Sequence, residues 1–171
     1  MNKNQKPNLI IILARKGTKN FTRQNIRLVN GKPLIYYIIK KCQEIGSADI
    51  FISTDSEEIK ELSTLYKVNW LDRPSELTKD DSSLEKIVYN SLIQLQKKNF
   101  NYKKCLVLNP HYPLIKKTTI NKFFSKLNNK IETIYGFEKD SEIEYNKIEK
   151  DQKLKSLKIN IVEKNKIISF N

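Results

Sequence analysis

A short basic loop directly follows the first apolar run of the chain. Leu9–Leu13 is continuously apolar, and the next residues, Ala14–Asn20, combine Arg15 and Lys19 with a single glycine, Gly17. Backbone N–H groups of such a loop can hold a phosphate chain while Arg and Lys neutralise its charge. The spacing is neither that of a P-loop nor GxGxxG. The residue types favour a phosphate site, and a solvated basic loop is the alternative.

The chain has a single histidine, His111, which also follows an apolar run. One imidazole excludes a site with several histidine ligands, and it leaves no convincing Ser–His–Asp triad. Cys42 and Cys105 are far apart, with no metal-type spacing and no disulfide framework, so we expect two reduced core thiols and a cytoplasmic location. His111 is interpreted either as a structural residue or as a group that binds or deprotonates a substrate near neutral pH.

Apolar patterns of strand and helix type alternate along the chain and must position these loops. We expect strands at 9–13, 50–52, 68–71, 105–108 and 131–137, and helices at 33–46, from Ser56, at 84–95 and at 120–127. This order predicts an α/β fold: a mainly parallel sheet with helices on both faces. Sites in such sheets lie at the carboxyl ends of the strands, so the loops after Leu13, Ser53 and Leu108 should share one rim. Residues 1–137 would form the core, and 138–171 a charged extension or oligomerisation arm.

Two polar segments carry helix-start signals. Ser82 with Glu85 three residues later fits a capping box. Asp55 either caps the helix that follows Ser56 or lies at the rim of the sheet.

Charge and hydropathy exclude some classes of protein. The chain of 171 residues has a net charge of +13, with Lys+Arg 32, and the only arginines are Arg15, Arg23, Arg27 and Arg73. Because readers of phosphate and base edges favour arginine, this diffuse lysine surplus is weak evidence for a nucleic-acid partner. No apolar run approaches the roughly 20 residues of a membrane span. We expect neither nucleic-acid nor membrane binding.

Five segments in order carry a family resemblance. They are Ala14–Lys19, Arg23–Ile26, Asn30–Leu34, Ser53–Ile59 and Arg73-Pro74-x-x-Leu77-x-x-Asp80. In order and spacing, from about Leu9 to Leu114, the chain resembles the acylneuraminate cytidylyltransferases. That family includes the CMP-sialic acid synthetases and the enzymes for legionaminic and pseudaminic acids. Each segment alone has a simpler explanation, such as a turn at Asn25 or a surface arginine at Arg73.

The resemblance implies a Rossmann-like nucleotidyltransferase fold and a homodimer. CMP would pass from CTP to the anomeric hydroxyl of a 2-keto sugar acid, with release of pyrophosphate and dependence on Mg²⁺. When the family's site is carried over by position, Arg15 and Lys19 would be the catalytic residues and would contact the triphosphate. The nucleotide-binding residues would be Arg15, Gly17, Thr18, Lys19, Asn25, Arg73, Asp80 and Ser82, and the sugar acid would meet Asn109, His111 and Tyr112.

The chain departs from the family at several of these positions. Lys16 stands where the family loop has a glycine, and Gln24 where it has a lysine. His111 and Tyr112 replace two small hydroxyl residues beside the sugar, which should change the acceptor. The family's magnesium ligands lie in a later segment with no recognisable counterpart before Asn171, so no metal ligand is assigned. The alternative is therefore a truncated, catalytically impaired homologue that binds nucleotide or a partner protein.

Overall fold

The computed structural model describes residues 6–17, 21–100, 102–126, 134–139, 142–147, 158–163 and 166–170. Its main sheet contains β1 (Asn8–Leu13), β4 (Ala48–Thr54), β5 (Asn69–Asp72), β6 (Lys104–Leu108), β7 (Ile134–Lys139), β8 (Glu142–Lys147), β9 (Lys158–Glu163) and β10 (Lys166–Phe170). The helices are α1 (Leu34–Gln43), α2 (Glu57–Leu65), α3 (Leu84–Lys97) and α4 (Lys117–Lys126), with short 3₁₀ turns η1 (Gln24–Ile26) and η2 (Ser75–Leu77). A small hairpin joins β2 (Leu28–Val29) and β3 (Lys32–Pro33).

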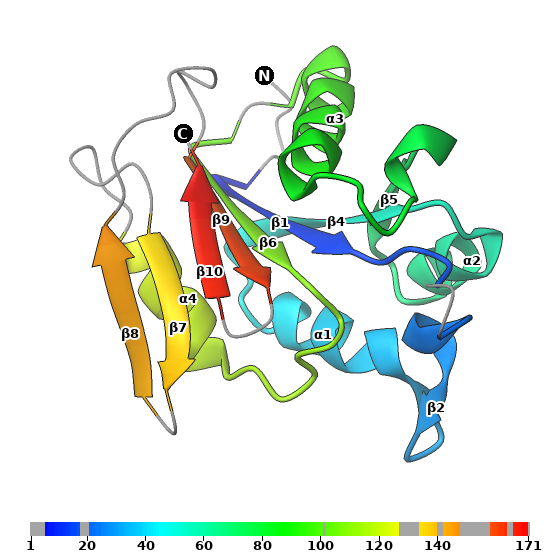
Figure 1. Cartoon of the computed structure of the whole chain (residues 1–171), viewed down its shortest axis with the longest axis horizontal. Helices are drawn as coiled ribbons and strands as arrows, with labels where there is room; N and C mark the ends of the chain where they lie inside the picture. The colour runs from blue at the N-terminus through cyan, green and yellow to red at the C-terminus, as the bar shows by residue number, and fades with distance from the viewer. Residues whose placement is uncertain are drawn as a thin grey trace.

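The predicted α/β fold is confirmed. The strand order is β5-β4-β1-β6-β9-β10-β7-β8, and β1 lies between two parallel neighbours, β4 and β6. Parallel strands need crossover connections, and the helices provide them. The carboxyl ends of β1, β4, β5 and β6 therefore point to one edge of the sheet, as Figure 1 shows.

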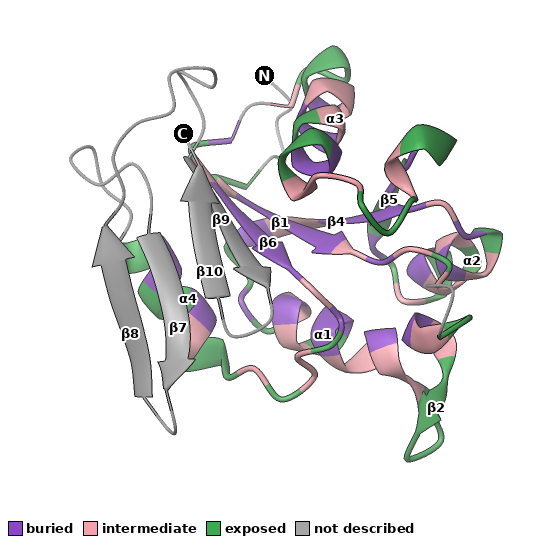
Figure 2. Ribbon diagram, in the orientation of Figure 1, coloured by how far each residue is buried: buried purple, intermediate pink, exposed green. Residues whose placement is uncertain are grey.

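The sheet core explains why the strands have continuous apolar sequences. Alternate side chains of a strand point to opposite faces, so a strand covered on both faces must be apolar throughout. In β1, Ile10 and Ile12 pack with α1, α2 and α4, whereas Leu9 and Ile11 pack with α3. Figure 2 shows the resulting buried layer between α3 and α1. None of the described helices has the length and apolar character that a membrane crossing requires.

The segment predicted as a charged extension contributes β8, β9 and β10 to this same sheet. β9 is parallel to β6, while β10 pairs antiparallel with β9 and with β7. The isolated apolar residues that we could not assign to a period are therefore partly strand residues. An oligomerisation role for 138–171, and the boundary at 137, stay predictions.

The helix starts differ in detail from the prediction. The residue at the N-cap of α3 is Ser83, so the capping box predicted from Ser82 is wrong by one residue. The Ser83 hydroxyl hydrogen-bonds the Glu85 carboxylate and makes no side-chain bond to the helix backbone. Ser56 is the N-cap residue of α2, and Asp55 is left available for another contact.

Candidate functional site

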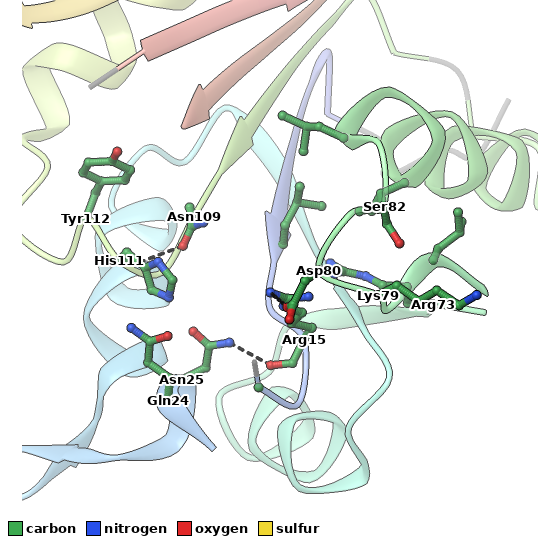
Figure 3. Close-up of a pocket in the computed structure, with 15 residues that line it drawn as sticks. Arg15, Gln24, Asn25, Arg73, Lys79, Asp80, Ser82, Asn109, His111 and Tyr112 are labelled. Carbon is green, nitrogen blue, oxygen red and sulfur yellow. Dashed lines mark hydrogen bonds and ion pairs between the residues drawn. The ribbon is translucent and has the colours of Figure 1, made fainter. Parts of the chain in front are cut away.

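A cavity of about 350 Å³ opens where the carboxyl ends of β1, β5 and β6 meet. Its lining comes from six parts of the chain: the end of β1, the loop after it, η1, the segment from Arg73 to α3, α3 itself and the loop after β6. The lining residues are Leu13, Arg15, Gly17, Gln24, Asn25, Arg73, Leu77, Lys79, Asp80, Ser82, Leu84, Ile87, Asn109, His111 and Tyr112. Figure 3 shows Arg15 and Asp80 on one side and Asn109, His111 and Tyr112 on the other.

The structure brings together nearly all the site residues predicted from the sequence. Nine of them line this cavity: Arg15, Gly17, Asn25, Arg73, Asp80, Ser82, Asn109, His111 and Tyr112. Thr18 and Lys19 lie outside the described residues. Sequence reasoning missed Lys79 and the apolar contribution of Leu77, Leu84 and Ile87, because lysine is abundant and these apolar residues look like ordinary core positions. The roles assigned to the residues predicted from the sequence stay predictions.

The Arg15 guanidinium is held by the segment that follows η2. Its Nη2 lies 2.6 Å from Asp80 Oδ1, and its Nη1 donates to the Thr78 carbonyl at 3.0 Å, 63 positions away in sequence. A guanidinium presents several donors in a fixed fork, so these two contacts orient it while part of the fork faces the cavity. The side chain of Arg15 keeps 24% of its surface exposed. A cation that is held in place and still accessible from the cavity suits an anion contact.

Asn25 connects η1 to the loop after β1. Its Nδ2 donates to the Arg15 carbonyl at 2.8 Å, shown as a dashed line in Figure 3. The residue is buried, and its Oδ1 has no hydrogen-bond partner in the described structure. A buried acceptor without a donor costs free energy. The geometry therefore leaves an acceptor at the cavity for a hydroxyl or amine of a ligand.

Arg73 is the most buried cation of the site. It follows β5, and its Nη2 donates to the Ser53 carbonyl at 2.9 Å, with Nε 3.4 Å from Ser53 Oγ. Loss of water lowers the pKa of Arg73 to about 10, the Asp55 carboxylate opposes this, and the Arg15 charge adds to it. The guanidinium still stays protonated at neutral pH. It links the end of β4 to the segment that holds Arg15.

The loop after β1 turns back tightly at Gly17. Gly17 pairs with Thr22 in an isolated bridge, and the Arg23 N–H donates to the Lys16 carbonyl at 3.0 Å. A Cβ on Gly17 would lie 2.8 Å from Arg23 N and Phe21 O, closer than real Cβ contacts. Only glycine fits this approach. Arg23 itself pairs with Glu58 at 2.5 Å and does not line the cavity.

Asp55 has a role at the rim and not as a helix cap. Its Oδ1 accepts the Lys16 N–H at 2.8 Å, which ties the loop after β4 to the loop after β1. The Lys16 side chain is exposed and is not part of the cavity lining. The lysine at this position therefore neither fills the cavity nor lines it.

The opposite side of the cavity is a compact turn after β6. Asn109 Oδ1 accepts the His111 N–H at 2.9 Å, and the Tyr112 N–H donates to the Asn109 carbonyl at 3.2 Å. The imidazole of His111 points into the cavity toward Asn25 (Figure 3). Loss of surrounding water lowers the pKa of His111, and the charge of Arg15 lowers it further. Both effects favour the neutral imidazole over the imidazolium.

Sequence comparison decides the family of the chain. The family model described as cytidylyltransferase matches residues 9–168. The chain belongs to the cytidylyltransferase family. It is 35% identical over 115 residues to the CMP-N,N'-diacetyllegionaminic acid synthase of Legionella pneumophila, covering 66% of this chain and 49% of that protein. It is also 35% identical over 122 residues to the pseudaminic acid cytidylyltransferase of Campylobacter jejuni, covering 70% and 52%.

These matches confirm the predicted family, but they cover only part of each relative. The cytidylyltransferase chain spans about half the length of the curated relatives that it matches. Among solved structures, a cytidylyltransferase from Leptospira borgpetersenii has a TM-score of 0.61 at 13% identity, covering 84% of this chain and 61% of that one. A CMP:2-keto-3-deoxy-manno-octonic acid synthetase complexed with CTP has a TM-score of 0.58 at 15% identity, covering 70% and 46%. At these identities the structures support the fold alone.

The described cavity of this cytidylyltransferase does not fit a protein-built metal site. Mg²⁺ prefers oxygen ligands in octahedral geometry, usually with one or two carboxylates. The one carboxylate in the described lining is Asp80, which pairs with Arg15, while Asn109 Oδ1 accepts the His111 N–H. Within the described residues, no three Asp, Glu, His or Cys side chains gather in a way that could hold a metal ion. We assign no metal ligand and derive no step through a metal.

Proposed function

We propose that this chain transfers CMP from CTP to the hydroxyl of a 2-keto sugar acid and releases pyrophosphate. The cavity at the strand ends carries the proposal. It gathers Arg15, Asn25 and Arg73, the positions at which the family resemblance puts the nucleotide. The relatives' names point to acceptors of the legionaminic, pseudaminic or sialic acid type.

Charge stabilisation is the main task of the residues that line the cavity. The triphosphate brings several negative charges, and the transition state spreads charge over the α-phosphate and the leaving pyrophosphate. Arg15 and Arg73 are fixed by hydrogen bonds before a ligand arrives, so little reorganisation is needed when CTP binds. Lys79 adds a third cation, for which no ion pair occurs in the described part of the chain. Gly17 lets the loop backbone turn tightly beside these cations. We propose that Thr18 and Lys19 also contact the triphosphate.

The nucleoside and the acceptor would occupy different ends of the cavity. Asn25 Oδ1 suits a donor from the nucleotide, such as a ribose hydroxyl, since the phosphates offer no proton at neutral pH. Asp80 and Ser82 would border the cytidine. The turn with Asn109, His111 and Tyr112 would hold the sugar acid, and holding both substrates at one site accounts for much of the rate enhancement in such reactions.

A coupled assay tests the activity. The protein is incubated with CTP, Mg²⁺ and each of three acceptors: N,N'-diacetyllegionaminic, pseudaminic and N-acetylneuraminic acid. We expect pyrophosphate release with at least one acceptor and none without acceptor, and less than a tenth of that rate with UTP or ATP. Mg²⁺ is included because the family resemblance implies it.

Gln24 supports a second candidate function, nucleotide binding without turnover. Gln24 lines the cavity at the position where the resemblance implies a lysine, so one expected positive charge is missing. Calorimetry with CTP separates the two functions. CTP binding without pyrophosphate release from any acceptor would favour the second candidate, and absence of CTP binding would contradict both.

The homodimer and the cytoplasmic location also belong to this proposal. The homodimer rests on the family resemblance, and the cytoplasmic location rests on Cys42 and Cys105, which are free and buried. Light scattering coupled to size exclusion would test the dimer, with a mass of one chain, 20.1 kDa, as the contrary result.

A further inference from the structure

The proposed reaction must remove a proton from the acceptor hydroxyl. A bond forms between that oxygen and the α-phosphorus, and the bond from the α-phosphorus to the bridging oxygen breaks. The bridging oxygen leaves with the electron pair as part of pyrophosphate. The hydroxyl proton then needs a base, and a positioned base contributes about 10²–10⁴-fold to such rates.

Most titratable groups that line the cavity cannot take this proton. Arg15, Arg73 and Lys79 are cations without a free lone pair, and the Tyr112 phenol is protonated at neutral pH. The Asp80 carboxylate is engaged by the Arg15 guanidinium at 2.6 Å. Among the described lining residues, one uncharged base remains.

We infer that His111 is the base that deprotonates the acceptor hydroxyl, an inference that rests on the proposed function. Its imidazole points into the cavity between the turn after β6 and Asn25, as Figure 3 shows. The backbone N–H of His111 donates to Asn109 Oδ1 at 2.9 Å, and this bond fixes the backbone that carries the ring. The unprotonated ring nitrogen accepts the proton, and the resulting imidazolium lies beside the developing negative charge of the triphosphate.

The charges around His111 fit a base that works at neutral pH. Both desolvation and Arg15 lower its pKa, which favours the unprotonated ring before substrates bind. Two further cations, Lys79 and Arg73, line the same cavity, and its one carboxylate, Asp80, is paired with Arg15. Bound CTP brings negative charge and should raise the pKa of His111, which strengthens it as a proton acceptor once the nucleotide is in place.

NMR can follow this residue without ambiguity, because the chain has a single histidine. The imidazole C–H signals are titrated in the free protein and with saturating CTP. We expect a pKa below the ordinary histidine value of about 6.5 in the free protein and a higher one with CTP. If CTP binds by calorimetry but leaves the titration of His111 unchanged, His111 does not lie beside the triphosphate and the inference is wrong.

Kinetics with His111→Gln and His111→Ala test the proton transfer itself. His111→Gln keeps polarity but cannot be protonated, so kcat should fall about 10²–10⁴-fold while the CTP dissociation constant changes less than threefold. The acid limb of kcat/KM should disappear in this variant. Free imidazole should restore part of the activity of His111→Ala and none of that of Arg15→Ala, which serves as the matched control.

The outcomes separate this inference from the proposed function. Wild-type turnover together with a His111→Gln variant that keeps both its rate and its acid limb overturns the inference alone. The inference is also overturned if the acid limb persists in His111→Gln and disappears only in Asp80→Asn, because Asp80 would then be the group that takes the proton. No pyrophosphate release by the wild-type protein with any acceptor contradicts the proposed function, and the base role falls with it.

Discussion

Two walls of the cavity are built in different ways. The arginine wall comprises Arg15, Asn25, Arg73 and Asp80, and the β6 wall comprises Asn109, His111 and Tyr112. Contacts between distant segments hold the arginine wall, such as Arg15 to Thr78 and Arg73 to Ser53, 63 and 20 positions apart. In the β6 wall, Asn109 bonds to the backbone N–H groups of His111 and Tyr112, two and three positions away.

The difference suggests what each wall contributes. The geometry of the arginine wall depends on the whole sheet, because its bonds connect the ends of β1, β4 and β5. The backbone of the β6 wall is held by a local turn, while the Tyr112 side chain packs against the core cluster that also contains residues of α1 and α4. The walls also differ in their departures from the family, because His111 and Tyr112 differ from it while Arg15 and Arg73 are kept. In the proposed reaction, the arginine wall holds the nucleotide and the β6 wall selects the acceptor.

The largest effect on stability should come from Arg73. Arg73 is 7% exposed, and its guanidinium shares the Ser53 carbonyl with the Ala14 N–H, so Arg73→Met removes a buried, charge-assisted hydrogen bond and leaves only the Ala14 donor. We expect the free energy of unfolding to fall by about 2–3 kcal/mol. Urea denaturation followed by circular dichroism measures it.

Arg73→Lys is the matched control for the charge. It keeps a cation but loses the planar fork, so its stability should lie between those of wild type and Arg73→Met. Equal stability of all three proteins would contradict the view that this side chain anchors the arginine wall.

Arg15 should matter mainly for ligand binding. Its fork is partly exposed to the cavity, and a charge-assisted hydrogen bond contributes about 1.5–3 kcal/mol. Arg15→Ala should therefore weaken CTP binding about 10- to 100-fold by calorimetry. Arg27→Ala removes an equally charged but exposed residue outside the cavity, which lies over the Phe21 ring, and should change CTP affinity less than twofold. Similar losses in both variants would indicate a nonspecific charge effect.

A substitution at Asn109 tests the β6 wall by the same measurement as Arg73→Met, the free energy of unfolding. Asn109→Ala removes the acceptor for the His111 N–H, a single neutral hydrogen bond within the turn. The free energy of unfolding should fall by about 1 kcal/mol, less than for Arg73→Met. A loss as large as that of Arg73→Met would show that the β6 wall also depends on distant contacts.

The sequence was sufficient to predict the parallel sheet and the gathering of the site residues. Continuous apolar strands and alternating helices determine the topology, and the topology brings the loops after Leu13 and Leu108 together. What it could not predict is the partner of each side chain. Asp55 bonds to the Lys16 N–H and does not cap α2, and the cap of α3 falls on Ser83, because a hydroxyl or carboxylate near a helix start has several backbone groups within reach.

The region after 137 shows a different limit of sequence reasoning. β8, β9 and β10 join the sheet, although each of them mixes apolar residues with charged and polar ones. β9 adds to β6 through backbone hydrogen bonds, which any sequence can make. Periodicity was therefore a poor guide here, whereas the buried strands at the centre of the sheet had to be apolar.

The smallest expected effect concerns the ion pair between Arg15 and Asp80. The pair is short, 2.6 Å, but its side chains are 24% and 49% exposed, and solvent-exposed pairs contribute about 0–1 kcal/mol. Asp80→Asn should change the free energy of unfolding by less than about 1 kcal/mol, because Arg15 keeps its bond to the Thr78 carbonyl. A double-mutant cycle with Arg15→Ala at low and high salt measures the coupling, which should decrease as salt is added. A coupling of 2 kcal/mol or more that resists salt, on the order of a buried pair, would mean that this ion pair, and not the bond from Arg73 to Ser53, anchors the arginine wall.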